Sequence, residues 1–347
     1  MLADELDYVL GVDTHRDEHV MAVVTAPAGG LVAGAAAAAN GRGYRELLRV
    51  AERHAPGRRA WAIEGTGSYG AGLTRFLSEH GEAVLEISRT PRTGRRLAGK
   101  DDSPDAVRIA RAALASETLA LPRSGERREA LRLLLITRRR AVDVRREALT
   151  QLRAVTVTAP ESLRDELRTL PLGKLLNRCS RLRRAGAADE LATRLVLRSL
   201  ARRVQAATVE ADQLERKIYA HVQSLAPSLL DEPGVGPIVA AQLIVAWSHP
   251  GRLRSDACFA RLAGVAPIPA SSGQTTRHRL SRGGDRQLNR GLHTIVLHRR
   301  QHDPATRDYI ARRVAEGKSR RDATRLLKRY LARHLYRLLQ QQEPLMT

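Results

Sequence analysis

Residues 7–25 read DYVLGVDTHRDEHVMAVVT, in which two runs rich in β-branched residues flank a polar turn. The runs at 7–13 and 19–25 have the composition of β-strands, and residues 14–18 supply the polar connection between them. These residues therefore predict a pair of β-strands, and Asp13 ends the first of them.

The pattern beyond this stretch alternates between strands and helices. Strand-like runs recur at 30–36, 59–63 and 83–88, and helical periods lie at 44–55 and 69–80. A third helix begins at Ser103 and Pro104, an N-cap residue followed by proline in the first helical position. Three strands followed by helix, strand, helix and strand predict a mixed α/β sheet with helices packed on it.

The middle of the chain predicts long helices. Segments 126–159 and 187–226 contain neither Gly nor Pro. Apolar residues of the second segment follow a spacing of 4-3-4-3-4, namely Leu200, Val204, Ala207, Ala211, Leu214 and Ile218. We interpret the two segments as an antiparallel hairpin or a coiled-coil arm, whose apolar seam offers a surface for self-association.

The last third opens with LDEPGVGPIVA at residues 230–240. A Pro-Gly-x-Gly turn between two helices is typical of a helix-hairpin-helix element, in which Gly234 and Gly236 let backbone amides reach a phosphate. An ordinary helix–helix turn is the alternative. A loop rich in Gly, Pro and Ser follows at 264–284, and basic helices are expected from 285 to 341.

Basic residues are concentrated outside the first part of the chain. The 347 residues include 59 Lys and Arg against 37 Asp and Glu, a net charge of +22. Residues 1–105 contribute −2, whereas 106–224 and 225–347 contribute +12 each. This asymmetry suits a carboxylate-bearing domain joined to parts that bind a polyanion, although arginine-rich codon usage would also produce solvated basic faces.

We therefore divide the chain into three predicted domains. These are an α/β catalytic domain at 1–122, a helical coiled-coil arm at 123–224 and a mainly α-helical C-terminal domain at 225–347. The C-terminal domain contains the helix-hairpin-helix-like turn and the serine-bearing loop.

Composition excludes several classes of protein. No run of about 18 apolar residues is present, so we expect no transmembrane helix and no membrane partner. The acidic residues within 1–7 predict no signal peptide, and two cysteines are too few for a disulfide framework or a cysteine-rich zinc site. The sequence has no Gly-x4-Gly-Lys-Ser/Thr motif to indicate ATP use. We expect an intracellular protein.

Four carboxylates are candidates for catalysis because of where they fall in this pattern. Asp13 and Glu64 each end a predicted strand, and Asp102 and Asp105 flank the start of a helix. Acids collected from strand ends and a helix start can hold two divalent cations, and Mg²⁺ prefers oxygen ligands. Taken singly, each acid is more commonly a turn former or a partner of the helix dipole. All four, however, lie in the only part without a basic surplus.

A second candidate group lies in the loop at 264–284. It contains Ser271 and Ser272, followed by Arg277, Arg279 and Arg282. These arginines can hold a scissile phosphate and stabilise the charge of its transition state. A serine in such a loop is commonly only a loop residue, and no His and Asp pair at a recognisable spacing offers a general base. A serine activated by metal-bound groups of another domain is the alternative.

Three blocks of the first part are similar to those of a known family. They are GVDTHRDEH at 11–19, IEGTG at 63–67 and KDDSPDA at 100–106, and together they resemble the DEDD transposases of the insertion sequence 110 type. The C-terminal part resembles the same family at PGVG 233–236, LAG 262–264, SSG 271–273 and SRGG 281–284. The chain departs from the family pattern at Arg16, where lysine is commoner. The tandem Ser271 and Ser272 leave the register of the serine open by one residue.

The resemblance implies an RNase H-like (RuvC-like) catalytic domain, with Mg²⁺ or alternatively Mn²⁺ held by Asp13, Glu64, Asp102 and Asp105. It implies a second catalytic element in which Ser272 forms a covalent phosphoserine link to DNA during strand exchange. It further implies DNA as substrate, at the element ends and the target, a structured guide RNA as partner, and a homo-oligomer, either dimer or tetramer. Such proteins act in the bacterial cytoplasm, associated with the nucleoid.

The resulting expectation is an enzyme, a transposase or site-specific DNA recombinase of an insertion element. Two alternatives stay open on the residues alone: a RuvC-like, Mg²⁺-dependent nuclease that hydrolyses branched DNA, and a non-enzymatic nucleic-acid-binding protein whose acids are structural. More than 160 residues separate the acids from Ser272. We therefore expect composite sites, with the acids from one subunit and the serine from its neighbour.

Overall fold

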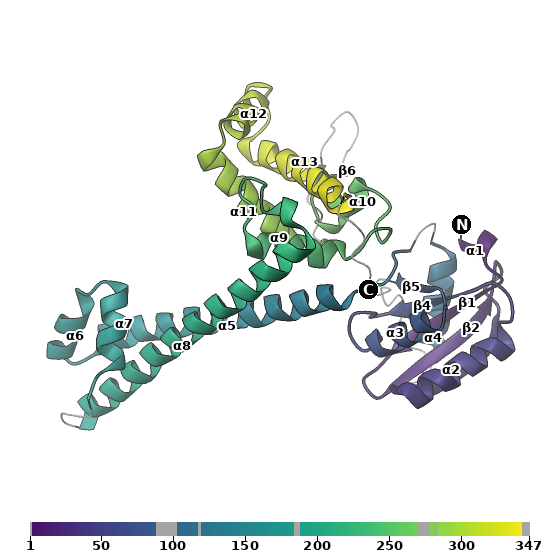
Figure 1. Ribbon diagram of the computed structural model, residues 1–347, viewed down its shortest axis with the longest axis horizontal. Coiled ribbons are helices and arrows are strands. Elements are labelled where there is room, and N and C mark those ends of the chain that lie inside the picture. The colour runs from purple at the N-terminus through teal and green to yellow at the C-terminus, as the bar shows by residue number, and fades with distance from the viewer. Residues whose placement is uncertain are drawn as a thin grey trace. The chain divides into compact units, whose positions relative to one another are not determined.

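A mixed β-sheet forms the first part of the chain (Figure 1). The computed structural model describes residues 2–87, 103–116, 119–183, 188–269, 278–279, 281 and 283–341. Within them, one sheet has the strand order β3-β2-β1-β4-β5. Its strands are β1 (Tyr8–Thr14), β2 (Glu18–Thr25), β3 (Leu31–Ala38), β4 (Arg59–Glu64) and β5 (Val84–Ile87), and a short helix, α1 (Leu2–Glu5), precedes them. The mixed α/β sheet predicted from the sequence is therefore confirmed.

Chain direction in the sheet follows from the length of the connections. β1 pairs antiparallel with β2, and β2 with β3, across short turns. β1 pairs parallel with β4, and β4 with β5, because helices carry the chain back between them. These helices are α2 (Gly41–His54), between β3 and β4, and α3 (Ala71–Glu79), between β4 and β5. α2 begins at Asn40, whose side chain accepts hydrogen bonds from two backbone amides of the first turn.

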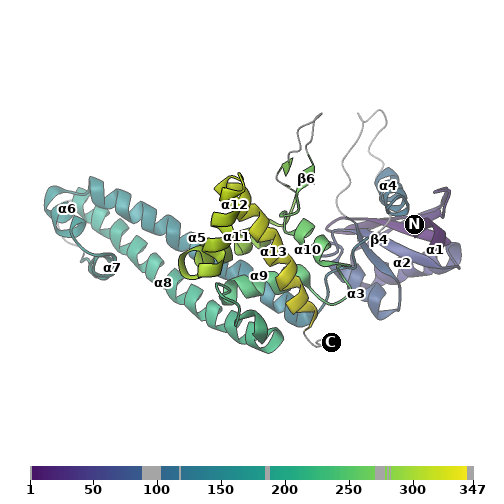
Figure 2. The same cartoon turned by 90° about the horizontal axis from the view of Figure 1, so that it is seen from above.

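Both faces of the sheet are covered by helices (Figure 2). Alternate residues of β1 point to opposite faces. Leu10 is buried with side chains of α2 and α3, whereas Val9 is buried with side chains of α4 (Ser103–Leu114). On the α4 face, a Cβ at Gly11 would lie 2.2 Å from the carbonyl oxygen of Ala106 and 2.5 Å from the amide nitrogen of Ala110. α4 therefore lies directly on the backbone of β1, at a distance that only glycine permits.

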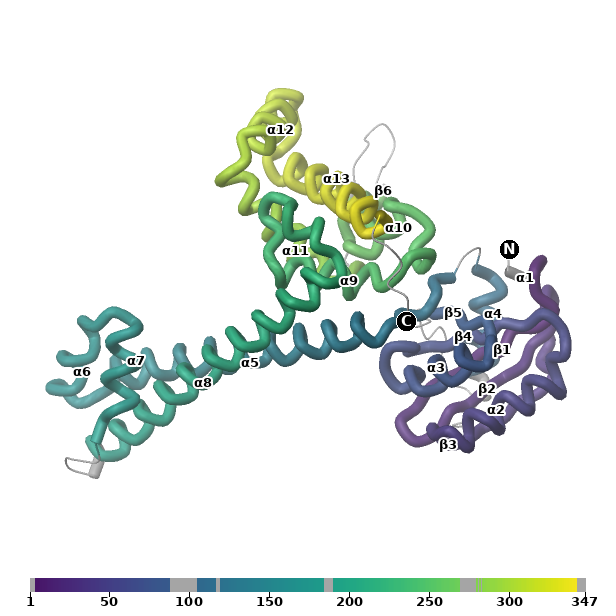
Figure 3. Tube along the Cα trace, in the orientation of Figure 1, coloured from purple at the N-terminus to yellow at the C-terminus, as the bar shows by residue number. Residues whose placement is uncertain are grey.

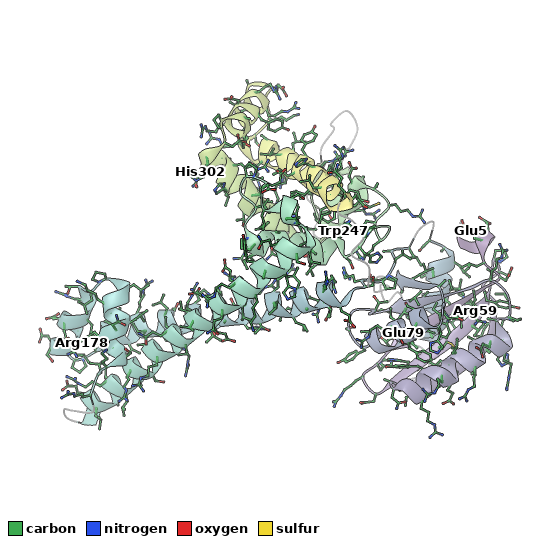
Figure 4. All side chains as sticks on the ribbon, viewed as in Figure 1. Glu5, Arg59, Glu79, Arg178, Trp247 and His302 are labelled. Carbon is green, nitrogen blue, oxygen red and sulfur yellow. The ribbon has the colours of Figure 1, made fainter. Side chains whose placement is uncertain are left out.

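Glu82, in the connection between α3 and β5, ties that connection to β4. Its carboxylate accepts hydrogen bonds from Nε and Nη2 of Arg59, at 2.9 and 2.5 Å, and from the indole nitrogen of Trp61, at 2.7 Å. Burial raises the pKa of Glu82, but the hydrogen bonds from Arg59 and Trp61 outweigh it and hold that pKa below its ordinary value. The carboxylate is therefore charged at neutral pH. Figure 4 labels Arg59 within this part of the chain.

Two long helices occupy the middle of the chain (Figure 3). α5 (Glu126–Thr158) and α8 (Ala188–Leu225) lie side by side, and the shorter α6 (Glu161–Arg168) and α7 (Leu172–Ser180) lie near one end of this pair. The two segments without Gly or Pro thus form the predicted helices, whereas the sequence pattern missed α6 and α7. Arg178 of α7, labelled in Figure 4, pairs with Glu166 of α6. The description as a coiled coil stays a prediction.

The apolar seam of α8 is not a free surface, so our interpretation of it as a self-association surface is wrong. Leu200 and Val204 are buried together with Leu152 of α5, and Ile218 is fully buried as well. An amphipathic pattern specifies that a face must be covered, but it does not specify by which partner. Here the partner is the same chain, and the homo-oligomer stays a prediction without this surface.

The rest of the described chain is mostly helical. It comprises η1 (Pro227–Leu229), α9 (Pro237–Trp247), α10 (Asp256–Leu262), α11 (Arg286–His302), α12 (Pro304–Ala315) and α13 (Arg320–Gln340), with β6 (Ile268–Pro269) and β7 (His278–Arg279) as a short antiparallel pair. The basic helices expected from 285 to 341 are confirmed. A single turn of 3-10 helix precedes the Pro-Gly-x-Gly turn, and the helix-hairpin-helix description stays a prediction.

Contacts divide the chain into two compact units. The first comprises Met1–Ser124 with His249–Arg254, and the second comprises Gly125–Ser248 with Ser255–Thr347. The segment at 249–254 joins the first unit because Arg252, which is buried, donates a hydrogen bond to Glu86 Oε2 at 3.3 Å. The predicted three-domain division stays a prediction. In the part of the chain that the structure describes, no helix is both long and apolar enough to span a membrane.

Replacing Gly11 by alanine tests the contact between β1 and α4. The added Cβ would collide with the backbone of α4, so we expect the free energy of unfolding to fall by about 1–3 kcal/mol. Urea unfolding of the full chain measures this by the fluorescence of Trp61 in a Trp247→Phe background, because the chain has 2 tryptophans. The control is Gly67→Ala, since no atom lies within 4 Å of a Cβ at that position. Equal stability of the two alanine variants would contradict the close contact.

Candidate active site

Asp13 and Glu64 occupy neighbouring positions at one edge of the sheet. The register of the parallel β1–β4 pair runs up to the residues just before them, so the two acids follow at the carboxyl ends of adjacent strands. Thr14 links the ends of β1 and β4, because its hydroxyl donates a hydrogen bond to the carbonyl oxygen of Glu64 at 2.8 Å. The chain then turns at Gly65, whose φ of +73° is a left-handed conformation that favours glycine.

Both carboxylates project from the face of the sheet that α4 covers. Asp13 lies two residues beyond Gly11, which contacts α4 through its backbone. Glu64 lies two residues beyond Ala62, which is buried with side chains of α4. Because alternate residues of a strand share a face, the two acids are directed toward the same side.

Asp105 lies in the first turn of α4, on the same face of the sheet. Ala106, the next residue, lies against Gly11 and is buried with Val20 of β2. Val20 is the residue that pairs with Asp13 across β1 and β2. The first turn of α4 is therefore level with Asp13, at the end of β1.

Asp13 and Asp105 each have a basic neighbour. Asp13 Oδ2 is 3.4 Å from His15 Nε2, and Asp105 Oδ1 is 3.0 Å from Arg108 Nη1. Both acids remain in contact with solvent, because their side chains are 18% and 26% exposed.

The donor set has the chemistry of a site for a hard divalent cation. Carboxylates supplied by separate elements are the ligands that Mg²⁺ prefers, and the cation keeps several waters. Within the ranges that the structure describes, no three His, Cys, Asp or Glu side chains form a group that could hold a metal ion. The fourth predicted ligand, Asp102, lies outside the described residues. A complete metal site is therefore a proposal that includes Asp102.

The two histidines of the first block are placed differently. His15 is half-exposed beside Asp13. His19 is fully buried and stacks on Tyr44 of α2, with the ring centroids 5.8 Å apart. Burial lowers the pKa of His19. His19 is therefore a core residue on the α2 side, and only His15 lies within reach of the acids.

The Pro-Gly-x-Gly turn is held by side chains of α11 and α13. Arg299 donates hydrogen bonds to the carbonyl oxygen of Pro233, at 2.8 Å, and to Glu232 Oε2, at 2.7 Å. His334 Nε2 lies 2.7 Å from the other carboxylate oxygen of Glu232. Burial raises the pKa of Glu232, but the hydrogen bonds from His334 and Arg299 outweigh it and hold that pKa below its ordinary value. The turn is thus a fixed element of the second unit.

The two glycines of this turn have different surroundings. Gly234 has a φ of +82°, and a Cβ there would lie 3.2 Å from the side chain of His298 on α11. Gly236 is the N-cap of α9, and a Cβ there would meet no atom within 4 Å. α11 therefore covers Gly234, whereas Gly236 is open at a helix N-terminus, where backbone amides attract anions. A role of either glycine in binding nucleic acid stays a prediction.

Four of the five predicted residues of the serine loop lie outside the described residues: Ser271, Ser272, Arg277 and Arg282. Arg279 is in β7, paired with Ile268 of β6, and its side chain is exposed. The short β6–β7 pair therefore lies within the loop at 264–284.

Sequence reasoning missed a lysine at the base of this loop. Lys328 of α13 donates a hydrogen bond from Nζ to Asn289 Oδ1 at 2.6 Å. The amide nitrogen of Asn289 in turn donates to the carbonyl oxygen of Ala263 at 2.7 Å, just before the loop begins. The sequence could have indicated Lys328 only through the rarity of lysine, because five of the 59 basic residues are lysine.

Two family models match separate parts of the chain. A family model of the DEDD transposases of the IS110 type, described as a transposase, matches residues 10–158. A model described as the transposase IS116/IS110/IS902 family matches residues 226–311. The first match includes the four predicted acids, and the second includes the Pro-Gly-x-Gly turn and the serine loop.

Two relatives come from insertion elements. The chain is 34% identical over 148 residues to the 43.6 kDa protein of insertion element IS110 from Streptomyces coelicolor. The aligned segment covers 42% of this chain and 36% of that relative. It is also 31% identical over 159 residues to the 42 kDa protein of insertion element IS900 from Mycobacterium paratuberculosis. That aligned segment covers 44% of this chain and 39% of the relative. The chain thus matches well under half the length of each relative. Because both models and both relatives indicate the same group, the chain belongs to the IS110 family of transposases.

Proposed function

We propose that this protein is the transposase or site-specific DNA recombinase of an insertion element, which cleaves and rejoins DNA by phosphoryl transfer. The observation that carries the proposal is the placement of Asp13 and Glu64 at the carboxyl ends of adjacent strands, on the face that α4 covers, with the first turn of α4, which contains Asp105, level with Asp13. The family match over residues 10–158 supports a catalytic use of these acids. A five-stranded sheet with helices on both faces also supports the RNase H-like, RuvC-like description.

The acids would hold a divalent cation, Mg²⁺ or Mn²⁺, with Asp102 as the fourth ligand. Such a cation neutralises charge on the scissile phosphate and lowers the pKa of an attacking hydroxyl. Asp13 and Glu64 come from rigid strand ends, which keeps these carboxylates in fixed positions. Arg108 beside Asp105 limits the negative charge of the cluster before DNA and the cation arrive.

Ser272 is the proposed nucleophile, with Ser271 as the alternative register. The serine oxygen forms a bond to phosphorus, and the bond from phosphorus to the leaving deoxyribose oxygen breaks. The serine loses its proton and the leaving oxygen gains one, so the DNA strand stays attached as a phosphoserine ester. Attack on that ester by a hydroxyl of another strand releases the serine and rejoins DNA.

The proposed partners follow from charge and from the family resemblance. Residues 106–347 carry a net charge of +24, which supports binding to a polyanion. DNA at the element ends and the target would be the substrate, and a structured guide RNA would select it. Arg279 is exposed within the serine loop and is available for a phosphate. A homo-oligomer with composite sites remains part of the proposal.

Isosteric amides test the acids as one unit. The variants keep the shape of each side chain but remove the charge that holds a cation; they are Asp13→Asn, Glu64→Gln and Asp105→Asn. We expect each to lower the rate of strand cleavage, and with it recombination, at least about 100-fold. The assay is Mg²⁺-dependent strand cleavage of a plasmid that carries the element and its flanking DNA. The control is Asp17→Asn, an exposed acid four residues from Asp13. Full cleavage by any one variant would remove that residue from the site.

Alanine at each serine separates strand exchange from hydrolysis. We expect Ser272→Ala to abolish the covalent protein–DNA adduct, because alanine lacks the attacking oxygen. A denaturing gel of end-labelled DNA measures the adduct. Ser271→Ala decides the register, and Ser281→Ala is a control because it lies beyond β7. Cleavage without any adduct in the unmodified protein would instead support the nuclease that uses water.

A further inference from the structure

A cavity of about 680 Å³ lies at the base of the serine loop within the second unit. We call it the loop-base cavity and define it by Pro267, Arg279, Asn289, Lys318, Lys328 and Arg329, which all line it. Pro267 precedes β6 and Arg279 belongs to β7, so residues of the loop form one wall of the cavity. α11 and α13, which pack against each other, supply further walls.

The charge that lines this cavity is uncompensated. Five basic side chains line it against one carboxylate, Asp322. Asp322 is already engaged, because its Oδ1 is 3.1 Å from Arg325 Nη1 and its Oδ2 is 2.6 Å from the hydroxyl of Ser319. Among the residues that the structure describes, the other four cations have no carboxylate partner: Arg279, Lys318, Lys328 and Arg329. Unpaired cations around a cavity favour an anionic occupant.

Lys328 is held in position by Asn289, which also lines the cavity. Asn289 accepts one of its ammonium hydrogens, and the same amide is oriented by its hydrogen bond to the carbonyl of Ala263. An ammonium group has three donors, so two remain for another acceptor. Burial and the neighbouring charge of Arg325 lower the pKa of Lys328, which makes its charged form costly without an anion nearby.

We propose that the loop-base cavity binds a phosphodiester group of a nucleic-acid strand, and that Lys328 and Lys318 are contacts to it. A backbone phosphate supplies the missing negative charge and accepts several hydrogen bonds at once. The inference rests on the proposed function only in requiring nucleic-acid binding, and it does not require recombination. It would position a strand at the foot of the loop that carries the proposed nucleophile.

Acetylation of lysines in the full-length protein tests the proposal without any substitution. The chain has only five lysines, which mass spectrometry can follow separately. Lys318 and Lys328 line the cavity, whereas Lys174 and Lys217 are exposed on α7 and α8. We expect a 30-nucleotide strand to slow acetylation of the two cavity lysines at least about fivefold, with little change at Lys174 and Lys217. Unchanged acetylation of Lys328 under saturating DNA and RNA would overturn the proposal.

The two arms of the experiment use DNA and RNA of the same sequence. Protection by DNA alone assigns the cavity to the element or target strand, and protection by RNA alone assigns it to a guide RNA; either result supports the phosphate site. Because binding is measured, a protein that protects these lysines but recombines nothing would defeat the proposed function and leave this inference intact.

Charge-neutral variants give an independent measurement. Lys318→Gln and Lys328→Gln should each weaken binding of the same strand about fivefold to tenfold, and each should reduce the slope of log affinity against log salt by about 0.7. Lys318 is exposed, so its variant keeps the test valid if Lys328→Gln disturbs packing. Lys217→Gln is the matched control, because it removes the same charge from α8. Equal losses in all three variants would show only an effect of net charge and would contradict the site.

Discussion

The contact between Gly11 and α4 is the constraint on which the candidate active site depends. Because α4 lies on the backbone of β1, its first turn comes level with the end of that strand. A side chain at position 11 would move α4 outward, and with it Asp105 in the first turn of that helix. The hydrogen bond from Thr14 to the carbonyl of Glu64 holds the other half of the same edge.

Paired and unpaired charges have different roles in this arginine-rich chain. Many carboxylates of the second unit are engaged by arginine, as Glu166 is by Arg178 and Asp256 by Arg333. Such pairs connect helices, and they leave no charge for a ligand. The loop-base cavity, by contrast, has cations without carboxylates, and the edge of the sheet has carboxylates that are partly exposed. A nucleic-acid phosphate and a divalent cation are the partners that would balance each group.

The sequence predicted elements well and tertiary partners poorly. Period-2 runs and breaker-free segments lie in the chain itself, so β1, β2, α5 and α8 could be placed from it. Asp13 and Glu64 each end a predicted strand, so their place at strand ends could be predicted from the sequence. The position of α4, which carries Asp105, depends on the contact at Gly11, and no local sequence pattern reveals that contact. The amphipathic pattern around Leu200 predicts a covered helix face but not which element covers it, so the interpretation as a self-association surface was wrong. The pair of Lys328 and Asn289 joins two helices and has no sequence signature.

Binding of Mn²⁺ to the full-length protein, measured by electron paramagnetic resonance, tests the central claim most directly. If the glycine contact aligns the acids, the Gly11→Ala protein should bind Mn²⁺ at least about tenfold more weakly than the unmodified protein, although every carboxylate is present. The Gly67→Ala protein should bind it normally. Normal Mn²⁺ binding by folded Gly11→Ala protein would contradict the account, because the acids would then converge without the close contact of α4 on β1.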